Sequence, residues 1–552
     1  MDIKEVHKEL IDSQGRRKYF KLLDPKLLDT PPKIDAQLIK KRKKVLFVMP
    51  NFHWIDEDVN ALWDIIPWNL CQIAAVINDL CSEVKIIDAY KDNLSEDELT
   101  KQIKDYKPDM VGLTVLMDQY AGVAPITTRI VKSISKDIIT ILGGVYAMAN
   151  PKRAMKDNNL DYVVIGEGEY VFKQLIGFHS GACDLPKRGI CFRKEGTNEL
   201  DNRGHAEFIK DLDALPRPSY HLIDFLSYCN KFNNRKTIDR PATYPYARII
   251  TSRGCPEKCS FCQVPSLQGS FFRMRSPDHI CDEIEFLKKE YGIKSILWDD
   301  DNLLTNTKRA KTLFKRMIER GLAMRWVYSC TAVFRLDEEL IDLMIESGCE
   351  YINIAIEAGS ERVTRDIVLK PLDYEHAKKM VAYAQKKGLF VAANFIIGFP
   401  TETWEEIRKT INFAEEINVD YAKFFIAIPL RNTEMFDLAV KTNSIIKDTY
   451  DGDTLWTVGG AIKSDHWSAD DLTILRAYEW DRINFSDPKK LKRIADRMAI
   501  SVDELNSIRK RTLENAKNTI SLRQSSSGNV MKSADIAQVV TQADSGKIQS
   551  KL

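Results

Sequence analysis

The sequence predicts an α/β protein with two successive parallel sheets, a doubly wound sheet first and a partial (β/α)6 barrel second, followed by a helical C-terminal segment. Short apolar runs alternate with amphipathic stretches from Lys44 to about residue 175, and the same alternation returns between residues 246 and 440. Strand and helix in this order imply right-handed crossovers and parallel strands. The 552 residues suffice for several such domains, each with its own core.

Changes in composition along the chain set the expected domain boundaries. The beginning is polar and Lys-rich, the stretch between the two sheets is rich in Pro, Arg and Asp, and the last stretch has no aromatic residues, which predicts disorder there. The expected segments are a lead-in over 1–43, the first sheet domain over 44–175, a connector over 176–245, the barrel over 246–440, a helical domain over 441–521 and a disordered tail over 522–552.

Composition and charge narrow the class of protein. Charged residues make up 29% and hydrophobic residues 44%, with a net charge of +2, which is ordinary for a soluble globular protein, so no nucleic-acid partner is expected. No apolar run of about 18 residues predicts a membrane span, and the first residues lack the apolar core of a signal peptide. The 11 cysteines are odd in number and mostly isolated, which favours a reducing compartment, the cytoplasm, over a disulfide framework.

Five apolar runs predict the strands of the first sheet. The first, KVLFVMP, is rich in branched residues and is closed by Pro50. The stretches between the runs have apolar residues at helical spacing, and one opens with Ser95 and Glu98 in the pattern of a capping box. Strands are expected at 44–50, 83–90, 109–116, 138–144 and 161–169, and helices at 67–80, 94–106 and 126–136.

The carboxyl ends of these strands are the expected ligand site, because doubly wound sheets bind ligands there. Paired glycines at two of the ends would let the backbone approach a large ligand, although they are equally compatible with simple turns. No G-x-G-x-x-G opens the first helix, which disfavours a dinucleotide. The candidate ligand-binding residues are Asn51, Phe52, Asp88, Tyr90, Thr114, Gly143, Gly144, Gly166, Glu167 and Gly168.

The order of strands and helices, with a late Gly-Gly and a Gly-Glu-Gly-Glu, resembles the Rossmann-like cobalamin-binding domain that precedes many radical enzymes. The resemblance covers roughly residues 44 to 175 and implies that the residues above contact cobalamin. Many such domains carry Asp-x-His-x-x-Gly, whose His ligates cobalt, and none of the 8 histidines here lies in that pattern. We therefore expect cobalamin without a histidine ligand, and a domain that holds no cofactor stays open.

The stretch RGCPEKCSFC at 253–262 places Cys255, Cys259 and Cys262 on one predicted loop. Thiolates suit soft metals, structural zinc takes four ligands from two separated pairs, and iron–sulfur clusters normally take four cysteines. CPEKCSFC resembles the CxxxCxxC signature of radical S-adenosylmethionine (SAM) enzymes. That resemblance implies that the three cysteines hold a 4Fe-4S cluster whose open iron binds SAM, while a purely structural role for them is the alternative.

Six strand–helix repeats around this motif predict the partial barrel, with its site at the carboxyl ends of the strands. With these repeats, the resemblance to radical SAM enzymes that carry a cobalamin domain extends over roughly residues 44 to 440. Beyond 440, a helical and aromatic stretch at 465–498 resembles the segment that closes the barrel in this family. The barrel strands are expected within 247–255, 295–304, 325–336, 351–360, 390–400 and 421–430.

The resemblance also implies roles for residues at the barrel strand ends. Phe261, Gly398 and Pro400 are expected near the adenine of SAM. Asp299, Asp300 and Asp301 are expected near its amino group and ribose, and the alternative is an acidic loop that caps the next helix.

Two further barrel residues are candidates. Glu357 lies in the apolar run IAIEAGS, where an unpaired charge is costly, so we expect either a SAM contact or a structural salt bridge. Cys330 is the candidate catalytic residue, since it shares a strand face with Trp326, Tyr328 and Ala332 that could face the barrel interior. An ordinary core position is the alternative for Cys330.

The family resemblance implies a cobalamin-dependent radical SAM enzyme, with methyl transfer to an unactivated carbon or phosphorus as the expected reaction. A cyclisation or rearrangement, or a non-catalytic cobalamin and iron–sulfur regulator, are the alternatives. The resemblance also implies an external electron donor such as flavodoxin or ferredoxin, and a substrate that is a small molecule, lipid or peptide. Because both cofactors must reach one substrate, the carboxyl ends of the two sheets are expected to face each other.

Overall fold

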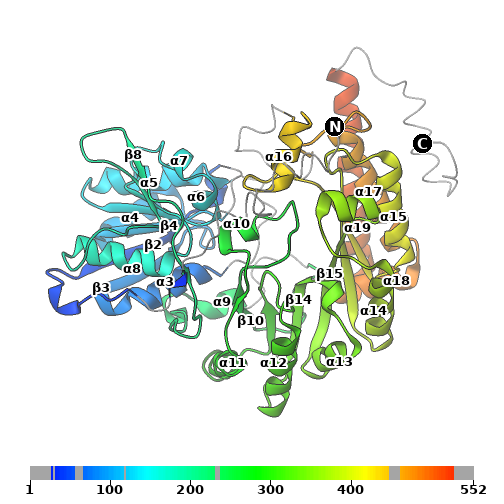
Figure 1. Ribbon diagram of the computed structural model, residues 1–552, viewed down its shortest axis with the longest axis horizontal. Helices are drawn as coiled ribbons and strands as arrows, with labels where there is room; N and C mark the ends of the chain where they lie inside the picture. Colours follow the sequence, from blue (N-terminus) through cyan, green and yellow to red (C-terminus); the bar gives the residue numbers. More distant parts are fainter. Residues whose placement is uncertain are drawn as a thin grey trace, which may run out of the picture.

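The computed structural model describes residues 27–28, 32–55, 66–116, 120–229, 237–446 and 460–526. Figure 1 shows two α/β units side by side, the N-terminal sheet domain in blue and cyan and the barrel in green and yellow, with the last helices in orange and red against the barrel. This arrangement confirms the predicted fold class. Most of the predicted lead-in and of the predicted disordered tail lies outside the described residues.

The N-terminal sheet has the strand order β3-β2-β4-β5-β6-β7-β8, and its first five strands in this order are parallel. The order reverses between β2 and β4, which is the point where doubly wound sheets bind ligands. The predicted capping box at Ser95 and Glu98 is present. The parallel strands are β2 (Lys43–Met49), β3 (Cys81–Asp88), β4 (Met110–Thr114), β5 (Ile139–Gly143) and β6 (Tyr162–Val164).

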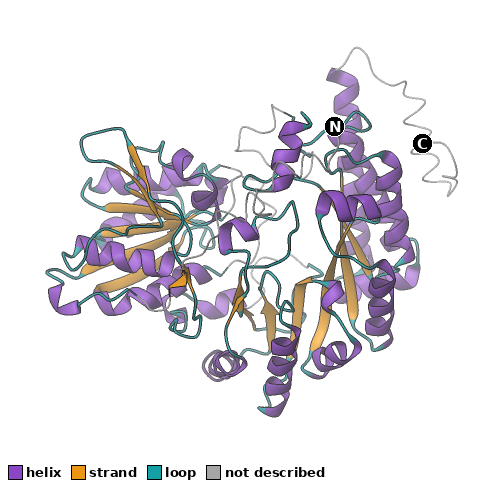
Figure 2. Ribbon diagram, in the orientation of Figure 1, coloured by secondary structure: helices purple, strands orange, loops and turns teal. Residues whose placement is uncertain are grey.

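Helices cover both faces of this sheet (Figure 2), as expected for strands that read as continuous apolar runs and are buried on both sides. They are α3 (Trp68–Ile77), α4 (Glu96–Tyr106), α5 (Val123–Ile134), α6 (Val145–Ala149), α7 (Pro151–Ala154) and α8 (Gly168–His179).

The connector contributes structure that the sequence patterns do not predict. Its strands β7 (Ile190–Arg193) and β8 (Leu200–Asn202) form an antiparallel hairpin that extends the N-terminal sheet. A short strand, β9 (Phe208–Ile209), pairs in parallel with β1 (Leu27–Leu28). Part of the connector is therefore an edge of the first domain and not a free linker.

The barrel sheet has six parallel strands in sequence order, as predicted. Its outer face packs on helices through large side chains such as Trp298, Trp326 and Phe314. The strands are β10 (Tyr246–Ile249), β13 (Ser295–Trp298), β14 (Arg325–Thr331), β15 (Cys349–Glu357), β16 (Phe390–Ile397) and β17 (Tyr421–Ile426). The helices are α11 (Pro277–Tyr291), α12 (Thr307–Glu319), α13 (Glu338–Glu346), α14 (Tyr374–Lys386), α15 (Trp404–Glu416) and α16 (Glu434–Lys441).

Three C-terminal helices, α17 (Ala469–Phe485), α18 (Pro488–Met498) and α19 (Val502–Ser526), complete the described chain. Phe485 of α17 and Ile494 of α18 join a buried cluster with Tyr351 and Phe390, which lie at the amino ends of β15 and β16. The carboxyl end of α17 and helix α18 thus cover the end of the barrel opposite the expected site, while Leu472 in the first turns of α17 lies next to Gly398 at the carboxyl end of β16. No helix in the described part of the chain is long and apolar enough to cross a membrane.

Candidate functional site at the junction of the two sheets

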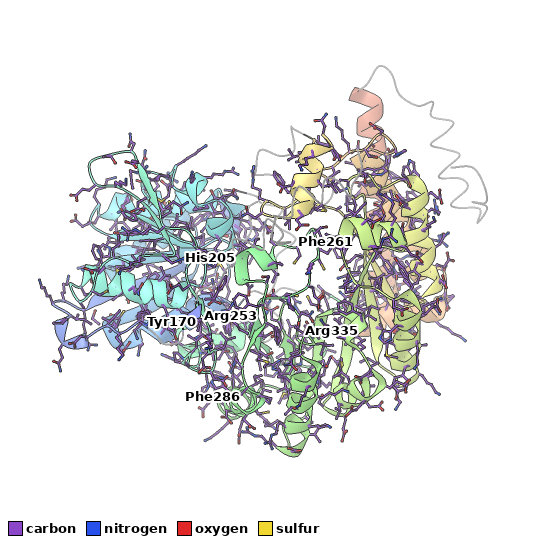
Figure 3. The ribbon with its side chains drawn as sticks, viewed as in Figure 1. Tyr170, His205, Arg253, Phe261, Phe286 and Arg335 are labelled. Atoms are coloured by element: carbon purple, nitrogen blue, oxygen red, sulfur yellow. The ribbon has the colours of Figure 1, made fainter. Side chains whose placement is uncertain are left out.

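A cavity of about 550 Å³ lies between the carboxyl edge of the N-terminal sheet and the first two barrel strands. Six of the candidate residues of the first domain line it, and Arg248, Asp299 and Asp301 line it from the barrel. In Figure 3, Arg253 lies where the two units meet, and Phe261 lies on the barrel side. A cavity common to both sheet edges is therefore present, but Asp300, Cys330, Glu357 and the three cysteines of 255–262 are not among its described lining residues. Its lining from the first domain includes Thr114, Gly143, Gly144, Gly166, Glu167 and Gly168.

Glycines shape the N-terminal wall of this cavity. A Cβ atom on Gly143 would meet nothing within 4 Å, so this strand end borders open space. Gly144 has a φ of 95°, and a Cβ there would lie 2.4 Å from the Val115 carbonyl oxygen, so only glycine fits the turn. Asn69 donates to the Thr114 hydroxyl over 3.0 Å. No histidine is among the described residues that line the cavity.

Four other candidates of the first domain are not among the described lining residues. Asn51 holds its own turn, since its amide donates to the Asn93 side chain over 3.1 Å and to the Leu94 carbonyl over 3.0 Å. The rings of Phe52 and Tyr90 pack on each other with centroids 5.2 Å apart.

Asp88, the fourth of these residues, accepts a 2.6 Å hydrogen bond from the Tyr228 hydroxyl of the connector. Burial raises the Asp88 pKa to about 6, although the Lys91 amide and Tyr228 lower it in part. The bond therefore ties the end of β3 to the connector, whose Tyr228 packs in the core of the barrel.

The three cysteines lie on the loop between β11 (Ser252–Arg253) and α10 (Val264–Gln268), which we call the cluster loop, residues 254–263. Its first residue, Gly254, has a φ of 80°. The Ser260 amide donates to the Val368 carbonyl over 3.0 Å, and the Ser260 carbonyl accepts from the Met435 amide over 2.9 Å. Backbone bonds to two distant segments thus fix the loop.

The donor set of the cluster loop fits an iron–sulfur cluster. Burial raises the pKa of all three thiols, that of Cys259 to about 12, so thiolates need a nearby positive centre such as iron. Among the described residues, no three His, Cys, Asp or Glu side chains converge tightly enough for a single metal ion.

The three aspartates after β13 have different environments. Asp299 accepts a 2.6 Å bond from Arg248. Asp300 accepts bonds from the Thr251 amide and hydroxyl and from the Ser252 hydroxyl, while its Oδ2 is buried without a partner among the described residues. Burial and then Asp300 raise the Asp301 pKa to about 7.

The alternative interpretation of the aspartates, a cap for the next helix, is wrong. Asn306 caps α12 through a bond from the Arg309 amide. Asp299 and Asp301 instead line the cavity.

Glu357 forms the salt bridge that was the structural alternative. Its carboxylate lies 2.8 Å from Lys370, and the two side chains are only 8% and 5% exposed. Lys370 also donates to the Ala355 carbonyl over 2.6 Å. The charge of Glu357 is therefore already paired, which removes the reason for expecting a ligand to pair it.

The turn after β16 is organised by a residue that the sequence analysis missed, Glu402. Gly398 and Phe399 donate their amides to its Oε2 over 2.6 and 2.9 Å. Burial raises the Glu402 pKa to about 8, and its Oε1 has no partner in the described part of the chain. Phe261 of the cluster loop lies against this turn, with its ring 6.2 Å from that of Phe399, and Pro400 is buried within the turn. The signal was present in GFPTET, as a lone acid in an apolar turn.

Cys330 faces the barrel interior, but not for the predicted reason. Trp326 and Tyr328 belong to the outer core. The register between β14 and β15 shifts between Tyr328 and Thr331, which breaks the alternation and turns Cys330 to the other face. Its side chain is exposed, so the core interpretation is wrong. The recess in which it lies, with Asp301 and Asp299 nearby, raises the thiol pKa to about 12.

Comparison with known proteins agrees with this geometry. Residues 59–176 match the family model of the B12 binding domain, and residues 249–414 match that of the radical SAM superfamily. An uncharacterized methyltransferase of Pyrococcus horikoshii is 30% identical over 415 residues, which cover 74% of this chain and 85% of that protein. The chain belongs to the cobalamin-dependent radical SAM enzymes.

Two other relatives of this cobalamin-dependent radical SAM enzyme extend the comparison. The cytidylyl-2-hydroxyethylphosphonate methyltransferase of Streptomyces wedmorensis is 29% identical over 452 residues, covering 74% of this chain and 83% of that protein. The solved structure of the cobalamin-dependent radical enzyme OxsB, with aqua-cobalamin and SAM, has a TM-score of 0.67 at 15% identity and covers 93% of this chain and 82% of that chain. At that identity the likeness shows the fold alone.

The family works with a 4Fe-4S cluster, SAM and cobalamin, and both faces of the cavity fit this set. The cluster loop, which directly follows the cavity residue Arg253, offers three half-buried thiols, and the opposite face offers open space at the strand ends.

Proposed function

We propose that this enzyme transfers a methyl group from SAM, by way of cobalamin, to an unactivated carbon or phosphorus of a small molecule. The observation that carries the proposal is the single cavity lined from both sheet edges. Reacting groups must come within about 3–3.5 Å of each other, so two cofactors that serve one reaction need a shared space. The similarity to a phosphonate methyltransferase supports the methyl-transfer reaction over a cyclisation.

In this proposal the chain's own residues divide into two sets. Cys255, Cys259 and Cys262 hold the cluster. Thr114 and the glycines of the opposite edge cradle cobalamin. When bound, the cluster, SAM and cobalamin supply reductive cleavage and a carrier for the methyl group.

Contacts to SAM are proposed for the barrel residues around the cluster loop. Asp299 and Asp301 already line the cavity, and Glu402 orders the turn at Gly398 by accepting its amide. We extend the proposal to Phe261, Asp300 and Pro400, which lie at or next to the same strand ends, and leave out Glu357, whose charge Lys370 already pairs. Cys330 is proposed to face the substrate, since its thiol is accessible inside the barrel.

The reaction also requires electrons from outside the chain. We include a flavodoxin or ferredoxin as donor in the proposal, together with a reducing compartment such as the cytoplasm. Eleven cysteines, none of them in a disulfide among the described residues, support such a setting.

The test uses SAM with an isotopically labelled methyl group. Reduced protein loaded with both cofactors is incubated with labelled SAM and a small-molecule extract of its host cells, and the extract is searched for newly labelled compounds. Cys255→Ala protein is the control. Label in a compound that the control does not produce supports methyl transfer. SAM consumption with only unlabelled, rearranged products would contradict it.

A further inference from the structure

A buried ion network joins the two units next to the cluster loop. Arg253 lies 2.5 Å from Glu169 and 3.2 Å from Glu167, and Arg273 lies 2.6 Å from Glu167. The two arginines belong to the barrel unit and are directly opposite each other on β11 and β12 (Arg273–Met274). The two glutamates are those of the Gly-Glu-Gly-Glu motif that follows β6.

The network is almost fully buried, although Glu167, Glu169 and Arg253 also border the cavity. The four side chains are between 4% and 9% exposed. Glu167 accepts from the Ile209 amide over 2.7 Å with its second oxygen, and Arg273 also donates to the Ile209 and Gln268 carbonyls. Although burial alone raises it, Arg253 and Arg273 hold the Glu167 pKa below its ordinary value. Charges that are buried and paired in this way define a unique geometry, because any other pairing leaves one of them unsatisfied.

The position of each member in the chain matters. Arg253 is followed directly by Gly254 and Cys255, so the guanidinium is anchored two residues before the first cluster cysteine. Glu167 stands between Gly166 and Gly168, which line the opposite wall of the cavity. Movement of one sheet edge relative to the other therefore has to break or stretch the pair between Arg253 and Glu169.

A second contact lies beside the network on the same seam. The His205 ring places Nε2 3.0 Å from the Leu267 carbonyl of α10, the helix that follows the cluster loop. Figure 3 shows His205 and Arg253 where the two units meet. Both ends of the cluster loop are thus tied to the first unit and its connector.

We propose that Arg253, Arg273, Glu167 and Glu169 are positioning residues that set the separation between the cluster and cobalamin. The glutamates of the Gly-Glu-Gly-Glu motif act on the arginines and not mainly on the ligand. The inference rests on the proposed function for its purpose, but the separation itself is measurable whatever the reaction is.

The experiment compares three full-length proteins loaded with both cofactors. Glu169→Gln removes one carboxylate of the network and changes none of the cysteines or glycines of the two sites. Arg253→Lys keeps the charge but cannot contact two carboxylates as the planar guanidinium does. Glu479→Gln is the matched control, because Glu479 is a buried carboxylate held by Arg408 and Arg482 away from the seam.

Pulsed electron paramagnetic resonance measures the separation between the reduced cluster and cob(II)alamin in each protein. The expected result is one narrow separation in the wild type and in Glu479→Gln, and a broadened or displaced one in Glu169→Gln and Arg253→Lys. Methyl transferred per SAM consumed is expected to fall about 10²-fold in Glu169→Gln, the loss that a misplacement of about 1 Å causes.

A narrow wild-type separation in both seam variants would overturn the proposal. If a variant does not take up cobalamin, hydrogen exchange of the full chain decides instead. Lost protection at 165–169 and 252–253, with the barrel strands still protected, supports the positioning role, and uniform loss across the chain overturns it. A wild type that transfers no methyl group contradicts the proposed function and leaves the separation result intact.

Discussion

The two sheet edges that face each other across the cavity differ in what they present. The N-terminal edge presents glycine backbone and a hydroxyl that is already bonded to Asn69, and its two glutamates are neutralised by arginines. The barrel edge presents three half-buried thiols and acids with raised pKa values, and it has buried oxygens of Asp300, Asn302 and Glu402 without partners among the described residues. The first edge is built to hold a ligand by shape, and the second to hold one by ligation and charge.

Removal of the ligands at the second edge has the largest expected effect. The triple variant Cys255→Ala, Cys259→Ala and Cys262→Ala should bind no cluster and cleave no SAM, since no other set of cysteines in the chain has ligand spacing. Cobalamin uptake should persist, because the opposite edge keeps its shape. Iron analysis and cobalamin absorbance after anaerobic reconstitution measure both. Eight irons per chain in the wild type, or iron retained in the variant, would contradict the assignment of one cluster to these three cysteines.

Filling the open space at the N-terminal edge should weaken cobalamin binding and leave the cluster in place. Gly143→Leu places a side chain where the structure has nothing within 4 Å of a Cβ, so the fold tolerates it while cobalamin is excluded. Overpacking of about 1–3 kcal/mol corresponds to an affinity loss of about 5- to 150-fold. Titration with cobalamin measures the loss, Gly143→Ala is the mild control, and cluster content should not change. Unaltered cobalamin affinity in Gly143→Leu would place the ligand elsewhere.

The contrast between the edges also explains what the sequence could predict. The cysteine triad, the succession of strands along the chain and the glycine-rich strand ends are local patterns. They predict which edge of each sheet borders the cavity. The rule that ligands bind at carboxyl strand ends selects an edge of the sheet but not the direction of each side chain. It therefore predicts Asn51 and Tyr90 as ligand contacts, whereas in the structure Asn51 bonds to the Leu94 carbonyl and Tyr90 packs on Phe52.

Long-range register and pairing were not predictable from the sequence. The shift that turns Cys330 inward arises between two strands and leaves no mark in the sequence around it. The bond between Arg253 and Glu169 joins residues 84 positions apart. Each residue alone is ordinary, and only the folded chain brings them together.

A smaller effect than the loss of either cofactor is expected from Glu402 at the barrel edge, because its raised pKa makes the stability of the fold depend on pH. Its pKa rises from 4.5 to about 8 on burial, so the folded state binds a proton that the unfolded state has lost. The stabilisation of the folded state by this proton is complete below about pH 4.5 and is lost as the pH rises to about 8. The free energy of unfolding changes by at most about 1.4 kcal/mol per pH unit in this range.

Glu402→Gln tests this because it keeps an amide-accepting oxygen without the ionisation. Urea unfolding of both proteins at several pH values should show the wild type losing stability relative to Glu402→Gln between those limits. Parallel stability curves for the two proteins would show that Glu402 is not protonated in the folded state.

The smallest effect is expected at Cys330. Cys330→Ser should leave iron content unchanged, because the residue lies in the barrel interior outside the cluster loop. Its thiol should also react slowly with alkylating reagents at neutral pH despite its exposure, since the pKa of about 12 leaves little thiolate. Mass spectrometry after timed alkylation of the cluster-loaded protein measures this. Rapid labelling of Cys330, or iron loss in Cys330→Ser, would require a different role.

The central claim is that one cavity between the two edges serves both cofactors, and an experimental structure of the loaded chain tests it most directly. The account predicts cobalamin against Gly143 and Gly144, the cluster on Cys255, Cys259 and Cys262, and continuous open space between them bordered by Asp299 and Asp301. Cobalamin bound on another face of the N-terminal sheet, or protein packed between the two cofactors, would contradict it.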